Sequence, residues 1–177
     1  MTSSATNYAN RGKSLETLIE HANEQYKAKG VALIQKVATP WTVIRKGPII
    51  VSAFPAQKST VDYIGVEGDQ RYSRPIAFDA KQCKLKTNFP LANIEQHQID
   101  FLTEWDNRGG TAFLIIEMTT LDKIFRIELS EIISYWLGSK AGGKKNIPIK
   151  DFEKFQEVGQ AGGIVLDYLN LYIKHQQ

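Results

Sequence analysis

The first clear pattern in the chain is an apolar stripe at helical spacing. Its members share one face of an α-helix and are Leu15, Leu18, Ile19, Ala22 and Tyr26. Gly30 follows, and glycine commonly closes a helix because it adopts positive φ at no steric cost. We therefore predict a helix that ends at Gly30, with Glu16 at the border of its buried stripe. The small, polar residues 1–9 predict a mobile N-terminal tail.

Short apolar and alternating runs predict strands in the next part of the chain. Residues 31–37 are apolar enough for a strand, and residues 41–45 alternate between apolar and polar side chains. Gly47 and Pro48 favour a turn into a second apolar run at 49–54. Together these residues predict a projecting β-hairpin.

Two further strand-like runs each carry an acid where a buried strand should not. Asp62 lies in the run 59–63, and Asp79 lies in the run 76–81. The residues between them, 67–75, are charged and contain a glycine, which predicts a surface connection.

The second half of the chain continues with helices and strands. Asn93 is expected to cap a helix that ends at Gly109 and Gly110. The remaining predicted elements are strands over 111–118 and 123–129, short helices capped by Ser130 and Asp151, and a last helix over 164–173. This order predicts an α/β fold with a central mixed sheet flanked by helices. Since no linker divides the chain, 10–177 is predicted to be a single domain.

Composition narrows the class of protein without deciding it. The chain has 177 residues, a net charge of +3 and one cysteine, so no intrachain disulfide can form. No apolar run approaches the roughly 20 residues of a membrane helix, and the start lacks the pattern of a signal peptide. We therefore expect a cytoplasmic protein with no membrane role. The basic residues beside the acid motif and in a glycine-containing loop favour nucleic acid, and they are Arg71, Arg74, Lys140, Lys144 and Lys145.

The two acids predict a metal site. Asp79 and Lys81 are two residues apart on a strand, so their side chains point to the same face. If the two runs are neighbours in one sheet, Asp62 reaches the same place, which gives oxygen ligands suited to Mg²⁺ or Mn²⁺ beside an ammonium group. Such a set suits phosphodiester hydrolysis. The alternative is a solvated strand end with an ion pair, which is common on protein surfaces.

Gln98 is also unusual, because it lies in the middle of an apolar helical stripe between Ile94 and Leu102. A buried amide needs hydrogen-bond partners. These partners are backbone groups of the core, a metal-bound water or a scissile phosphate. The three histidines show no metal-ligand spacing.

In this order, several segments of the chain resemble the RecU family of Holliday junction resolvases, within the PD-(D/E)xK nuclease superfamily. The similarity covers about 10–172, and its segments are Asn10-Arg11-Gly12, Leu15-Glu16, 58–63, 78–81, 89–94, His97-Gln98, 113–116, Tyr135-Trp136 and Asp167-Tyr168. The resemblance implies a restriction-endonuclease-like core and a Mg²⁺-dependent endonuclease that resolves four-way junctions during recombination and repair. It leaves open whether a RecA-type recombinase is a partner.

The resemblance also implies roles for individual residues. Asp62 and Asp79 would bind the metal, with Glu16 as a third or water-mediated ligand and Gln98 assisting as a further residue of the metal site. Lys81 would orient the attacking water or stabilise the charge on phosphorus. The residues expected to contact phosphate or support the ligands are Arg11, Ser59 and Thr60. A homodimer follows from the near-two-fold symmetry of the junction, since two matched nicks need two related sites.

Two departures from the family pattern keep other functions open. Asp79 stands where glutamate is usual, which predicts slower cleavage or a preference for Mn²⁺. The hairpin with Arg45 and Lys46 at its tip looks shorter than the stalk that the family is expected to place in the junction centre. The alternatives are a superfamily nuclease acting on duplex or flapped DNA, and a junction-binding recombination factor without catalysis.

Overall fold

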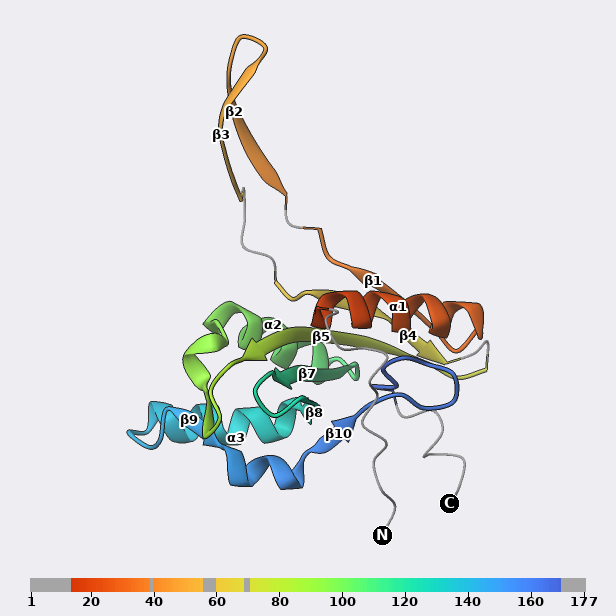
Figure 1. The fold of residues 1–177 in the computed structure, drawn as a ribbon, viewed down its shortest axis with the longest axis vertical. Helices are drawn as coiled ribbons and strands as arrows, with labels where there is room; N and C mark the ends of the chain where they lie inside the picture. The colour runs from red at the N-terminus through yellow and green to blue at the C-terminus, as the bar shows by residue number, and fades with distance from the viewer. Residues whose placement is uncertain (1–13, 39, 56–59, 69–70, 170–177) are drawn as a thin grey trace.

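The computed structural model describes residues 14–38, 40–55, 60–68 and 71–169. At its centre lies a six-stranded sheet in the order β1-β4-β5-β7-β8-β10 (Figure 1). Its strands are β1 Ala32–Lys36, β4 Tyr63–Gly68, β5 Ser73–Cys83, β7 Thr111–Met118, β8 Lys123–Glu128 and β10 Gln156–Val158. The β5–β7 pair is parallel and the other neighbours are antiparallel, so the sheet is mixed. The predicted α/β class is confirmed.

Helices cover both faces of this sheet. Helix α1 (Leu15–Ala28) packs on one face, whereas α2 (Gln96–Asn107) and α3 (Leu129–Lys140) pack on the other. Since side chains alternate along a strand, Phe78 of β5 joins the core under α1 and Ala77 joins the core under α2. Strand β5 therefore places alternate residues in two separate layers.

The α1 layer is aromatic at its centre. Tyr63 and Phe113 stack on the two sides of Phe78, each with ring centroids 4.8 Å apart. Offset aromatic pairs of this kind contribute about 0.5–1.5 kcal/mol beyond the area they bury. The stripe on α1 packs against these rings, and Gly30 adopts φ +68° just beyond the helix, as the sequence predicts.

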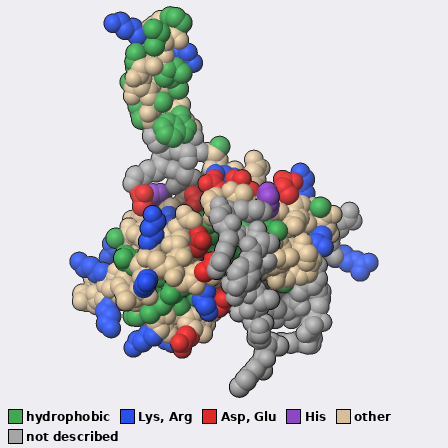
Figure 2. All heavy atoms as spheres, in the orientation of Figure 1, with side chains coloured by type: hydrophobic (Ala, Val, Ile, Leu, Met, Phe, Trp, Pro, Cys, Tyr) green, Lys and Arg blue, Asp and Glu red, His purple; other side chains and the backbone are tan. Residues whose placement is uncertain are grey.

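The hairpin is confirmed and stands away from the sheet (Figure 1). It consists of β2 (Trp41–Lys46) and β3 (Ile49–Pro55), and Gly47 supplies the positive φ of its turn. Figure 2 shows hydrophobic side chains along its length and basic ones at its tip. The exposed large hydrophobic residues of the hairpin are Trp41, Val43, Ile44, Ile49, Ile50, Val51 and Phe54.

Smaller elements complete the α2 side. Strands β6 (Asn88–Pro90) and β9 (Asn146–Pro148) form a two-stranded sheet, and the 3₁₀ helices η2 (Leu91–Asn93) and η3 (Ile149–Lys154) follow them. No helix among the described residues is long and apolar enough to cross a membrane.

Three predicted helix caps are wrong. Helix α2 is capped by Glu95 and not by Asn93, because Glu95 and Gln98 form a reciprocal capping box. Glu128 and Glu131 do the same at the start of α3, which displaces Ser130 into the first turn. Asp151 lies inside η3 after Pro148, where its carboxylate accepts a hydrogen bond from the Tyr135 hydroxyl.

The bounds of the motif strands also differ from the prediction. Strand β4 begins at Tyr63, one residue after Asp62, and β5 begins at Ser73. Most of the predicted surface connection at 67–75 is thus paired strand, since Glu67 faces Arg74 and Gly68 faces Ser73. Cross-strand pairing outweighs the polar composition of this segment.

The helix predicted over 164–173 is wrong for its described part, 164–169, which is irregular. Tertiary contacts replace the helical hydrogen bonds there. The Tyr26 hydroxyl donates to Asp167 and accepts from the Leu169 amide, and the Arg126 guanidinium donates to the Tyr168 carbonyl. Residues 170–173 and the predicted tail, 1–9, lie outside the described residues.

Candidate active site

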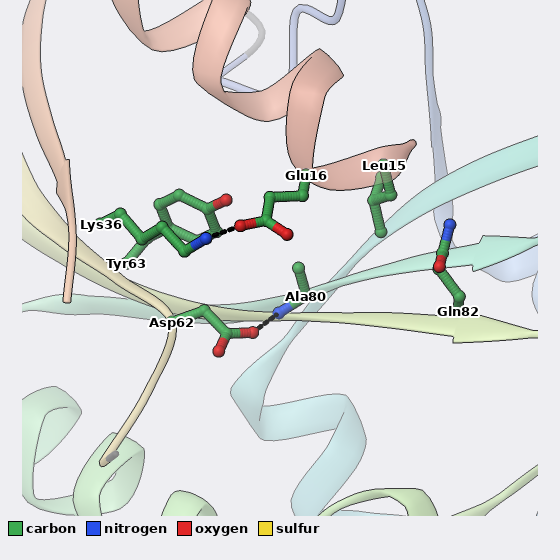
Figure 3. Close-up of a pocket in the computed structure, with 7 residues that line it drawn as sticks. All are labelled: Leu15, Glu16, Lys36, Asp62, Tyr63, Ala80 and Gln82. Atoms are coloured by element: carbon green, nitrogen blue, oxygen red, sulfur yellow. Dashed lines mark hydrogen bonds and ion pairs between the residues drawn. The ribbon is translucent and has the colours of Figure 1, made fainter. Parts of the chain in front are cut away.

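The site forms where β4 and β5 part. Their last paired residues are Tyr63 and Phe78, beyond which β5 continues to Cys83 beside β7. The carboxylate of Asp62 takes up the amide that this separation leaves, since Ala80 N donates to Asp62 Oδ2 at 3.0 Å (Figure 3). Asp62 is therefore fixed beside β5 even though it precedes its own strand.

Asp79 lies on the α2 side of β5 and is fully buried. Gln98 Nε2 donates to its Oδ1 at 2.8 Å, and the Lys81 Nζ lies 2.6 Å from its Oδ2. Among the described residues, Oδ2 accepts no well-aligned hydrogen bond. The Lys81 ammonium is therefore the cation beside this buried oxygen, which has no hydrogen bond of good geometry in addition.

The charges of Asp62 and Asp79 favour a bound cation. Burial raises the pKa of Asp79 above its ordinary value, and the negative charge of Asp62 raises it further, while Lys81 acts in the opposite direction. One ammonium therefore does not balance the two carboxyl groups. A divalent cation bound between them would favour the ionised form of both.

Gln98 confirms the prediction that its amide points inward, and it has two different partners. Its Oε1 accepts from the Glu95 backbone amide at 3.0 Å, while its Nε2 holds Asp79. The carbonyl oxygen of the side chain thus caps helix α2, and the amide nitrogen binds the acid. In this geometry Gln98 fixes the orientation of the Asp79 carboxylate.

Glu16 does not join the two acids in this structure. It lies exposed in the first turn of α1 and forms an ion pair with Lys36, at the end of β1. The Lys36 Nζ also lies 3.6 Å from Glu20. No cluster of three or more His, Cys, Asp or Glu residues is arranged for a metal within the described ranges. The role of Glu16 as a ligand stays a prediction.

The predicted DNA-contacting residues are dispersed. Arg45 and Lys46 lie exposed beside the hairpin turn. Arg74 lies at the far end of the β4–β5 pair, five residues or about 17 Å of strand from Asp79. Its guanidinium donates to the Tyr72 hydroxyl and pairs with Glu67. Arg71, at the same end, is exposed, so neither arginine lies beside the acids.

The predicted lysine loop is wrong in one member. Lys140 belongs to the last turn of α3, where its ammonium lies 5.1 Å from the centre of the Trp136 ring. Lys144 and Lys145 are exposed in the loop before β9. Thr60 is exposed next to the site, and the predictions for Arg11 and Ser59 fall outside the described residues.

Sequence reasoning missed two residues beside the acids, Lys36 and Tyr63. Both line a cavity with Glu16 and Asp62 (Figure 3). Tyr63 follows Asp62 directly. Because successive side chains of a strand point to opposite faces, the sequence could have indicated which face Tyr63 points to. Lys36 had no such signal, because its position depends on how β1 pairs with β4.

Comparison with known proteins identifies the family. The family model described as Recombination protein U matches residues 10–174. The chain belongs to the RecU family. The relative named Holliday junction resolvase RecU from Geobacillus sp. (strain WCH70) is 36% identical over 155 residues, which are 84% of this chain and 75% of the relative. The relative of the same name from Oenococcus oeni (strain ATCC BAA-331 / PSU-1) is 40% identical over 153 residues, covering 83% and 76%.

A solved structure outside these RecU relatives also overlaps with the chain. It is Archaeoglobus fulgidus Hjc, described as a Holliday junction resolvase, with 14% identity and a TM-score of 0.40 over 78% of this chain and 94% of that one. At this level the overlap supports no conclusion about the chain.

Proposed function

We propose that this RecU family member is a metal-dependent endonuclease that resolves four-way DNA junctions. The observation that carries the proposal is a pair of carboxyl groups with a single ammonium: the partly buried Asp62 and the fully buried Asp79, beside Lys81. The relatives named Holliday junction resolvase support the choice of substrate.

The residues present fit a divalent cation such as Mg²⁺, with Mn²⁺ as a substitute. Asp62 and Asp79 would hold it, because hard cations prefer carboxylate oxygens. When bound, the metal would polarise the phosphate and lower the pKa of an attacking water.

The protein's own contribution is positioning and charge. The Ala80 amide fixes Asp62 and the Gln98 amide fixes Asp79, so neither carboxylate needs to reorganise during the reaction. Lys81 is largely buried beside them, where its ammonium orients the attacking water or stabilises negative charge on the phosphate oxygens. Gln98 supports the site by holding Asp79, and its role as a metal ligand stays a prediction.

Junction selectivity is assigned to the hairpin. Arg45 and Lys46 at its tip would lie among converging phosphates, a feature of DNA shape and not of base sequence. The exposed apolar side chains below the tip suit the open centre of a junction, where base pairs lack a stacking neighbour.

The symmetry of the substrate sets the assembly. Two matched nicks in strands of like polarity need two sites related by a two-fold axis, so we propose a homodimer. A RecA-type recombinase as partner and a cytoplasmic location remain predictions.

One substrate panel tests this function against its rivals. An immobile four-way junction, the matched duplex and a flap are incubated with Mg²⁺, Mn²⁺ or EDTA, and binding and nicking are scored together. Metal-dependent nicking of the junction above the other two is expected. Equal nicking of duplex or flap would favour the general nuclease, and junction binding without nicking would favour the non-catalytic factor.

A further inference from the structure

A cavity of about 260 Å³ lies on the α1 side of β5 and includes Asp62 in its wall. Lys81 lies on the other side of the strand, because residues 79 and 81 face α2 and residue 80 faces α1. The cavity thus borders the acid pair and is distinct from the side that holds the catalytic ammonium. Figure 3 shows Glu16, Lys36 and Tyr63 around it.

The Tyr63 hydroxyl is a buried polar group whose partner is missing. The residue is 2% exposed, and the hydroxyl has no hydrogen bond among the described residues. The other two buried tyrosines on this side of the sheet differ, since Tyr26 bonds Asp167 and Tyr168 bonds Asn23. Leaving a buried hydroxyl unpaired costs about 1–3 kcal/mol. The unpaired tyrosine is therefore the one that lines the cavity, where a ligand can supply the missing hydrogen-bond acceptor.

Lys36 supplies a cation to the same cavity, and Glu16 pairs with it at the cavity wall. The two side chains are about half exposed and form an ion pair over the cavity, with Glu20 as the second neighbour of Lys36. Exposed pairs of this kind contribute at most about 1 kcal/mol, so an external anion can displace Glu16. The Glu16 carboxylate holds the Lys36 ammonium, as a phosphate oxygen would do in its place.

We propose that this cavity is a subsite for a DNA backbone phosphate adjacent to the one being cut, with Lys36 and Tyr63 as its donors, and that Glu16 holds Lys36 in the DNA-free protein. The inference rests on the proposed function, since it takes DNA as the source of the phosphate. Glu16 must release Lys36 before the phosphate binds, so in the absence of metal it weakens DNA binding, while Lys36 and Tyr63 strengthen it. Because any charge near DNA acts with these signs, a matched charge change elsewhere on α1 is needed to isolate the subsite.

Binding of a labelled immobile junction in EDTA tests the subsite without cleavage. Lys36→Gln is expected to weaken binding. It should also reduce the slope of log affinity against log salt concentration by up to about 0.9, the value of one lost phosphate contact. Tyr63→Phe keeps the ring on Phe78 and should weaken binding roughly 2–12-fold, the value of one hydrogen bond. Its thermal midpoint in the DNA-free protein should be unchanged or higher, because the removed hydroxyl is unpaired.

Glu16→Gln should tighten binding, and Glu20→Gln is its matched control, with the same charge change one turn further along α1. The gain from Glu16→Gln above that control should disappear in the Lys36→Gln background, because the freed partner is absent.

If Glu16→Gln binds no better than Glu20→Gln, or if the gain persists without Lys36, the subsite is wrong. A fall in the thermal midpoint of Tyr63→Phe with no loss of DNA affinity would make the tyrosine structural. Both results require that the parent protein binds junctions in EDTA, and a parent that binds no DNA of any shape would instead overturn the proposed function.

Discussion

Asp79 is a buried carboxyl group held between an amide and an ammonium, and its proton is therefore linked to stability. Its pKa in the folded protein is raised above the unfolded value, mainly by burial. Within the window between the two pKa values, the folded state keeps a proton that the unfolded state loses. The free energy of unfolding must then fall as the pH rises through that window.

Asp79→Asn removes this linkage. In EDTA, the variant should melt at a higher temperature than the parent at pH 8, by roughly 2–4 °C for each kcal/mol gained. The difference should shrink at pH 5 and below, where the parent carboxyl holds its proton. Thermal melts of both proteins across this range check the prediction, and a difference that does not change with pH would contradict it.

Lys81 is expected to act on the chemical step. Lys81→Ala should slow single-turnover cleavage by about 10² or more, the scale of losing one preorganised charge contact, without weakening metal binding. The exposed Lys84, three residues further along, provides a matched control in Lys84→Ala. Weaker metal binding with an unchanged rate would make Lys81 structural.

Among the described elements, the hairpin has exposed apolar side chains that do not pack in the core. Its two strands pair only with each other, and its described side chains are exposed. Replacing 45–48 with a two-residue Asn-Gly turn should preserve the fold and the metal site, since that turn suits a hairpin. Junction cleavage should fall far more than duplex binding. If the altered protein prefers junctions as strongly as the parent, the hairpin does not read the junction.

The three lysines at the end of α3 and in the loop after it belong to two elements, so the loop pair can be tested separately from Lys140. Replacing Lys140, Lys144 and Lys145 with alanine should weaken junction and duplex binding to a similar degree. The slope of log affinity against log salt concentration should fall by up to about 0.9 for each lost phosphate contact. The two loop lysines alone should account for most of the change, because Lys140 lies over Trp136. An unchanged salt dependence would make the loop an ordinary solvated connection.

Elements with a local signal were predictable, and elements set by tertiary contacts were not. The stripe of α1 and the turn of the hairpin are encoded in neighbouring residues, and the shared face of Asp79 and Lys81 is encoded in the strand period. The irregular segment 164–169 depends on contacts with Tyr26 and Arg126, more than 40 residues away in the chain. The ion pair of Glu16 with Lys36 was equally hidden, since it needs the packing of α1 on the sheet.

At the scale of the whole molecule, one chain provides one acid pair, whereas resolution needs two cuts. The net charge of +3 provides only a mild attraction to DNA, so shape and symmetry must supply selectivity. A two-fold dimer on the junction would place one site on each of two strands of like polarity.

The most direct measurement is single-turnover cleavage of an immobile junction with each strand labelled separately, by the parent, Asp62→Asn and Asp79→Asn, in Mg²⁺ and in EDTA. The parent should make paired nicks in two strands of like polarity in Mg²⁺ and none in EDTA. Both cuts should be made before the complex dissociates. Each variant should lose cleavage while binding the junction within a few-fold of the parent, because the phosphate-contacting surface is intact. Retained cleavage in both variants, or single unpaired nicks by the parent, would contradict a metal-dependent resolvase built on this pair of acids.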